Sequence, residues 1–189
     1  MTNSSPDLFQ SPTESVVKAM ARDKDTDVSF VAGSIPGIGM AAGDTLRLPL
    51  PDHNMSAANV ALVRGSGDAQ ALYRQHHNRG IHSKNAPQER EAAALFSALE
   101  NVRCEALGGR AMDGVARNIS SVLKQKCIKL GYDKATDTDR MPLSDALHLK
   151  AYHDLTGVTP PAAVKRALEP WQSQLAGMDM GALSALLHD

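Results

Sequence analysis

Three consecutive segments of the chain repeat their apolar residues with the period of an α-helix, and this pattern constrains the fold more than any other feature. The segments cover about residues 56–80, 87–109 and 110–130. In each one, apolar side chains recur at steps of three and four, which places them on one helix face. Ser56 is a suitable N-cap for the first segment. We therefore predict three packed helices, with Leu99, Val102, Ile119 and Val122 buried between the second and the third.

The residues before these helices predict a small β element. Residues 27–31 are rich in side chains that favour strands, and residues 45–50 alternate Leu with Arg and Pro. Pro49 restricts the second strand to the edge of a sheet, because proline has no N–H to donate. The glycine-rich segment between them indicates a mobile loop. The simplest interpretation is a two-stranded β ribbon, preceded by a short helix over residues 13–24.

Proline and glycine mark the helices that follow. Pro142 should open a fourth helix that ends at Gly157, and a fifth should begin at Pro160-Pro161. Pro170 should break that helix, and residues 179–187 should form a last short one. The predicted fold is mainly α: a bundle of about five to seven helices with a small β ribbon near the N-terminus. We assign residues 1–12 to a disordered tail and residues 13–189 to a single helical domain.

Composition excludes several classes of function. The formal net charge is −1, which gives no general attraction to nucleic acids or anionic lipids. No apolar run approaches the roughly 20 residues that span a bilayer, so we expect a cytoplasmic protein with neither nucleic acid nor membrane as partner. Cys104 and Cys127 are the only cysteines and do not form a CxxC pair. Two buried thiols are the expected outcome.

Histidines supply the only dense group of candidate metal ligands. His76, His77 and His82 lie near the end of the first long helix. A zinc or cobalt site needs three or four converging ligands, and no HExxH pattern accompanies these histidines. The favoured interpretation is a half-buried His76 with His77 and His82 in solvent. A metal site built from the three histidines stays open as the alternative.

Three charged residues in the second long helix form the other candidate site. Glu100 and Arg103 are three positions apart and can pair along one helix face. Glu105 follows closely. A structural ion pair is the favoured interpretation, and a surface that binds a partner is the alternative. No nucleophile motif accompanies these residues, so we predict no catalytic residue in the chain.

The order of the motifs resembles a known family. Arg64-Gly65-x-Gly67-Asp68 in the first long helix is followed by the run 100–108, which begins Glu100-Asn101-Val102-Arg103. Met112-Asp113-Gly114-Val115 and Pro142-Leu143-Ser144-Asp145 come next. This string is similar to the N-terminal region of the T-type subunit of aerobic cobaltochelatase, the CobT family. The C-terminal von Willebrand A domain of that family is absent, and we therefore expect the chain to be part of a longer subunit.

The resemblance implies a role in aerobic cobalamin biosynthesis. Cobaltochelatase inserts cobalt into hydrogenobyrinic acid a,c-diamide at the expense of ATP. The implied partners are an AAA+ ATPase subunit and a large corrinoid-binding subunit. The complex implies ATP, Mg and cobalt, whereas no cofactor is expected in this chain. We expect the chain to be a non-catalytic assembly module that is inactive alone. The alternatives are a small His-based metal-dependent enzyme and an unrelated helical adaptor.

Overall fold

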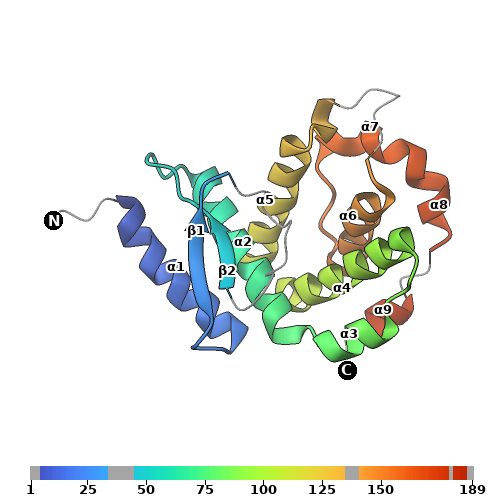
Figure 1. The fold of residues 1–189 in the computed structure, drawn as a ribbon. Helices are drawn as coiled ribbons and strands as arrows, with labels where there is room; N and C mark the ends of the chain where they lie inside the picture. Colours follow the sequence, from blue (N-terminus) through green and yellow to red (C-terminus); the bar gives the residue numbers. More distant parts are fainter. Residues whose placement is uncertain (1–4, 34–44, 135–140, 179–180, 187–189) are drawn as a thin grey trace.

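A computed structural model describes residues 5–33, 45–134, 141–178 and 181–186. Four helices form its main body: α2 (Ala57–His76), α4 (Arg90–Ala111), α5 (Asp113–Lys129) and α6 (Leu143–Thr156). Figure 1 shows a small sheet and α1 (Ser5–Ala21) at one end of the molecule, with α4 and α6 toward the other. The mainly helical fold with two strands near the N-terminus is confirmed.

The long helices enclose one large apolar core. α5 packs mainly against α2, and α6 packs mainly against α4. The core takes buried side chains from α4, α5 and α6, together with Leu72 of α2. Val102, Ile119 and Val122 are fully buried, as predicted, whereas Leu99 is only partly buried at the margin. The helix faces inferred from the apolar period are therefore correct, with the exception of the depth of Leu99.

Glycines allow two of these helix contacts to be unusually close. A Cβ atom on Gly65 of α2 would lie 2.3 Å from the backbone oxygen of Asn118 in α5. A Cβ atom on Gly108 of α4 would lie 2.4 Å from Cδ1 of Leu72. The sequence placed the end of the second long helix at about residue 109, on the Gly108-Gly109 pair, whereas α4 continues to Ala111. Both glycines are buried inside α4, since the space that a side chain would need is already filled by neighbouring atoms.

The two strands pair in parallel. β1 (Asp27–Val31) aligns with β2 (Thr45–Pro49), so that Val28 lies opposite Leu46. Leu46 and Leu48 are buried in a second apolar cluster with side chains of α1 and α2. On β2, the side-chain amide of Gln70 accepts a hydrogen bond of 3.0 Å from Arg47 N and donates one of 2.7 Å to Arg47 O. The loop predicted between the strands lies mostly outside the described residues.

Several predicted boundaries were wrong at the N-terminal side. α1 begins at Ser5, so residues 5–12 are helical where the sequence suggested a disordered tail. α2 ends at His76, and a short helix α3 (Arg79–Asn85) follows, because the Asn78 side chain accepts a hydrogen bond from Ile81 N and caps it. α4 begins after Glu89, whose carboxylate accepts hydrogen bonds from two backbone N–H groups and replaces the predicted start at Pro87.

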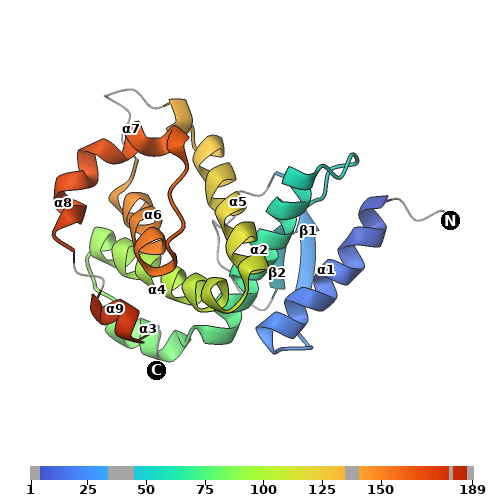
Figure 2. The ribbon, with the colours of Figure 1, turned by 180° about the vertical axis from the view of Figure 1, so that it is seen from behind.

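Short elements complete the C-terminal third. η1 (Tyr132–Lys134) follows α5, and α6 is capped at its C-terminal end by Gly157, which has a φ of 75°. The segment after Pro161 is broken into η2 (Ala162–Val164), α7 (Lys165–Leu168), η3 (Glu169–Trp171) and α8 (Gln172–Ala176), with the expected interruption at Pro170. Figures 1 and 2 both show α9 (Gly181–Leu186) beside α3. Within the described residues, no helix is long and apolar enough to cross a membrane.

Asp68 gives the fold a pH-dependent stability. Its buried carboxylate accepts a hydrogen bond of 2.8 Å from Asn118 Nδ2, and burial raises the pKa of Asp68 from 3.8 to about 6. The folded state therefore favours the protonated form. The contribution of Asp68 to the free energy of unfolding is fully present below about pH 4 and is lost as the pH rises through about 6.

Asp68→Asn should remove this part of the pH dependence. The amide oxygen can still accept the hydrogen bond from Asn118, while no charge is buried at neutral pH. We expect the variant to exceed the wild type in stability at pH 7 by at most roughly 3 kcal/mol, with a smaller difference at pH 4. Urea denaturation at the two pH values measures this. A stability difference between the two proteins that does not change with pH would contradict the prediction.

Candidate functional site

Arg103 connects α4 to the end of α2. Its Nε donates a hydrogen bond of 2.8 Å to Glu100 Oε2, and its Nη2 donates one of 2.9 Å to Glu100 Oε1. The same Nη2 donates a hydrogen bond of 2.8 Å to the backbone oxygen of His76. That oxygen lies at the carboxyl end of α2, where a cation is favoured by the helix dipole. The i,i+3 pair inferred from the sequence is therefore present and also holds the neighbouring helix.

Glu100 of α4 also contacts the end of α2, through His77. His77 Nδ1 lies 2.9 Å from Glu100 Oε1, so the carboxylate contacts both Arg103 and the residue that follows α2. Burial would raise the pKa of Glu100, but the hydrogen bonds with Arg103 and His77 outweigh burial and lower it. The hydrogen bond to Glu100 raises the pKa of Arg103, which keeps the guanidinium charged. Both charges are thus satisfied within the protein.

The histidines lie in a row of rings. His77 stacks on Tyr73 with centroids 4.1 Å apart, and His82 meets the edge of His77 at 4.8 Å. Phe96 of α4 lies 4.8 Å from His82 on the other side. The predicted exposure of His77 and His82 was wrong, since both are partly buried in this row. The contact between His82 and Phe96 connects α3 to α4. α3 itself contributes no buried residue.

The described residues contain no group of three or more His, Cys, Asp or Glu side chains that could hold a metal ion together. His76 is partly buried, as predicted, and burial together with the Arg103 and Arg22 charges lowers its pKa. His77 points to Glu100, while His82 Nε2 lies 3.5 Å from Ser97 Oγ. His77 and His82 therefore have different side-chain partners.

Glu105 lies apart from Glu100 and Arg103 and has a different partner. Its Oε2 lies 2.8 Å from His148 Nε2, and the two side chains are only 9% and 7% exposed. The pair joins α4 to α6 inside the core. Sequence reasoning missed it, because the residues are 43 positions apart and no local pattern relates them. The two side chains depend on each other, because either one alone would be a buried polar group without a hydrogen-bond partner.

A second polar group lies close by between α5 and α6. Asp145 Oδ1 accepts a hydrogen bond of 2.8 Å from Lys126 Nζ, and Oδ2 accepts one of 2.6 Å from the Tyr132 hydroxyl. Burial opposes ionisation of Asp145, but the Lys126 charge and these hydrogen bonds outweigh it and lower the pKa. The residues line a small cavity with His148. Sequence reasoning did not identify this network, which stabilises the packing of α6.

Both cysteines are free and buried, as expected. Burial raises the pKa of Cys104 to about 12 and the pKa of Cys127 to about 11. The thiolate is the reactive form of cysteine, so neither thiol is suited to nucleophilic chemistry near neutral pH. Their contribution is to packing.

Arg103→Lys should lower the stability of the protein. A lysine ammonium cannot reproduce the planar guanidinium that bonds two carboxylate oxygens and a backbone oxygen at once. We expect the free energy of unfolding to fall by about 1–2 kcal/mol, measured by urea denaturation. Arg117→Lys on the exposed surface of α5 is the matched control and should change little. Unchanged stability together with weakened binding of a partner subunit would instead make Arg103 a docking residue.

The chain matches the model of a known protein family. The family model of the cobalamin biosynthesis protein CobT matches residues 3–189. No solved structure matches the chain.

Proposed function

Because the chain belongs to the family of the cobalamin biosynthesis protein CobT, we propose that it is a non-catalytic assembly module of ATP-dependent cobaltochelatase. A role in cobalamin biosynthesis follows from the family itself. The proposal goes beyond this role in two points. The reaction is the insertion of cobalt into hydrogenobyrinic acid a,c-diamide, and the chain serves the assembly of the enzyme that carries it out. The family match over residues 3–189 is the observation that carries the proposal.

The internal pairing of the charged residues supports an assembly role. Glu100, Arg103 and His77 direct their polar atoms at one another and at the end of α2. Glu105 is paired in the core with His148. General acid–base chemistry needs groups that can reach a substrate, and these groups are committed to holding helices together. The interpretation of this cluster as an internal clamp is therefore favoured over that of a catalytic centre.

The partners in this proposal are an AAA+ ATPase subunit and a large corrinoid-binding subunit. ATP and Mg²⁺ would be bound by the ATPase subunit, and cobalt and the corrinoid would be bound by the large subunit. The chain would contribute a rigid helical body that the ATPase subunit recognises. The interhelical clamps would keep that body in one shape through the ATPase cycle.

Co-purification tests the proposal directly. A tagged AAA+ subunit of cobaltochelatase, mixed with this chain and ATP, should elute with it as one complex in size-exclusion chromatography. An AAA+ ATPase from an unrelated complex is the control and should elute separately. Separate elution of the chain and the cobaltochelatase AAA+ subunit, with ATP and with ADP, would contradict the assembly role.

Metal analysis separates this proposal from the small metal-dependent enzyme. The purified chain, dialysed without chelator, should contain far less than one bound metal ion per molecule. A stoichiometric metal ion that is lost in a His77→Gln or His82→Gln variant would favour the enzyme.

A further inference from the structure

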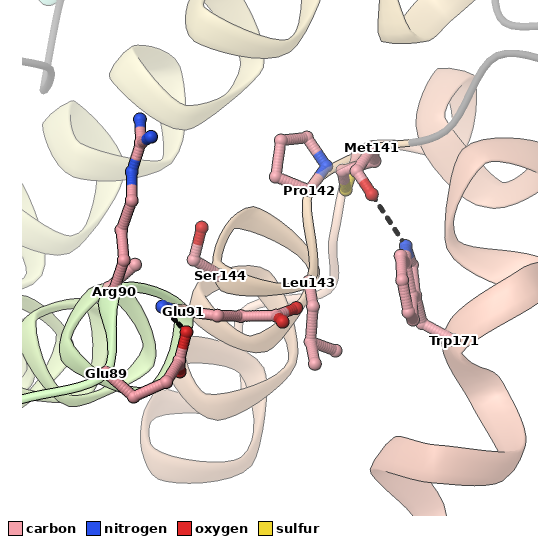
Figure 3. Close-up of a pocket in the computed structure, with 9 residues that line it drawn as sticks. Glu89, Arg90, Glu91, Met141, Pro142, Leu143, Ser144 and Trp171 are labelled. Atoms are coloured by element: carbon pink, nitrogen blue, oxygen red, sulfur yellow. Dashed lines mark hydrogen bonds between the residues drawn. The ribbon is translucent and has the colours of Figure 1, made fainter. Parts of the chain in front are cut away.

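A groove opens between the first turn of α4, the first turn of α6 and η3. Its volume is about 420 Å³. Met141, Pro142, Leu143 and Ala94 give it apolar walls, and Trp171 forms one side. Figure 3 shows the Trp171 ring across the groove from the acidic residues of α4. The groove lies outside the Arg103 cluster and shares no residue with it.

Trp171 is held in place before any ligand binds. Its indole Nε1 donates a hydrogen bond of 2.7 Å to the backbone oxygen of Met141, as the dashed line in Figure 3 marks. Met141 is fully buried, so this anchor is part of the core. An aromatic ring that is already oriented loses little conformational entropy on binding, which favours contact with a ligand.

The charge on the groove comes mainly from two carboxylates. Glu89 uses its carboxylate to cap α4, through hydrogen bonds of 2.9 Å from Glu91 N and 2.7 Å from Ala92 N. Among the residues that the structure describes, the Glu91 carboxylate has no hydrogen-bond or ion-pair partner. Figure 3 shows it extending between Ser144 and Leu143, whereas the Arg90 guanidinium points away. Glu91 therefore places a negative charge across the groove from the Trp171 ring.

Glu91 lies in the first turn of α4, where the dipole of that helix favours a carboxylate. Asp145 takes the corresponding place in α6 and is held there by Lys126 and Tyr132. Glu91 differs from Asp145 because it lines the groove.

From this arrangement we propose that the groove binds a lysine or arginine side chain of a partner protein. The aliphatic stem would pack on Pro142 and Leu143, and the cation would lie between the Glu91 carboxylate and the Trp171 ring. Carboxylates and tryptophan rings both attract cations, and apolar walls favour a long aliphatic stem. The partner is thus a protein segment that presents a basic residue flanked by apolar ones. The proposal is independent of the cobaltochelatase assignment.

Tryptophan fluorescence tests the proposal, because Trp171 is the only tryptophan in the chain. The probe is the peptide acetyl-Leu-Arg-Leu-amide, and the matched peptide carries Gln in place of Arg. We expect a saturable change in Trp171 emission with both peptides. The Arg peptide should bind about threefold to tenfold more tightly, and added salt should reduce the difference.

Variants locate the source of the preference. Glu91→Gln should remove most of the preference for the Arg peptide and leave the part that the Trp171 ring contributes, while binding of the Gln peptide stays the same. Glu169→Gln, in the same short element as Trp171 but outside the groove lining, should change neither affinity. Circular dichroism checks that the variants fold. Equal affinity of the wild type for the two peptides, a preference of the same size in Glu91→Gln, or no emission change at millimolar peptide would each overturn the proposal.

Discussion

Gly65→Ala should lower the free energy of unfolding by about 3 kcal/mol or more, which is at or above the usual cost of overpacking. The added Cβ atom would lie 2.3 Å from Asn118 O, 2.6 Å from Asn118 C and 2.6 Å from Val122 Cγ2. Two of these atoms belong to the backbone of α5 and cannot rotate away. α2 and α5 would therefore have to separate along their whole contact. The hydrogen bond from Asn118 to Asp68 would be strained by the same movement.

Gly114→Ala is the matched control for this substitution. Gly114 lies in the first turn of α5, and a Cβ atom there would meet no atom within 4 Å. Alanine favours the helix over glycine, so the control should stabilise the protein by about 0.5–1 kcal/mol. Urea denaturation of both variants gives the comparison. Equal stability of the two variants would show that α2 and α5 do not meet at Gly65 as described.

Glu105→Leu should lower the free energy of unfolding by about 3–5 kcal/mol. The substitution leaves His148 in the core without its partner, which in the wild type lies 2.8 Å away. A double variant, Glu105→Leu with His148→Leu, should be more stable than the Glu105→Leu single variant. It replaces both polar groups with apolar ones, and therefore leaves no buried polar group unsatisfied.

An exposed pair in the same region provides the control. Lys150 and Asp154 pair at i,i+4 on α6, where both side chains are partly exposed to solvent. Asp154→Ala should cost less than about 1 kcal/mol, because surface ion pairs contribute little. The measurement is a double-mutant cycle for Glu105 and His148 by chemical denaturation. Additive effects of the two single variants would show that the buried pair is not energetically coupled.

Local signals in the sequence predicted the helical frame. Ser56 caps α2 as expected, with its hydroxyl oxygen accepting a hydrogen bond of 3.2 Å from Asn59 N. Gly131 and Gly157 have φ angles of 76° and 75°, which glycine adopts easily just beyond a helix end. The Glu100–Arg103 pair could also be predicted, because residues three positions apart on a helix are neighbours whatever the rest of the fold.

Contacts between distant segments were not predictable in the same way. Gly108 is a helix-ending signal in isolation, but here it makes room for Leu72 of another helix. Glu89 caps α4 with a longer side chain than the usual capping residues, so the start was misplaced at Pro87. The partner of Glu105 depends on how α6 docks on α4, and the apolar period of α6 carries no information about it.

The contact between Gln70 and Arg47 bears on how the protein behaves at high concentration. An unpaired strand edge is a template on which other chains can add strands and grow into aggregates. The side-chain amide of Gln70 bonds both the backbone N–H and the backbone oxygen of Arg47, as an adjacent strand would. Pro49, further along β2, has no N–H that could donate a hydrogen bond to an added strand. On this side of the sheet, Gln70 and Pro49 together thus disfavour edge-to-edge polymerisation.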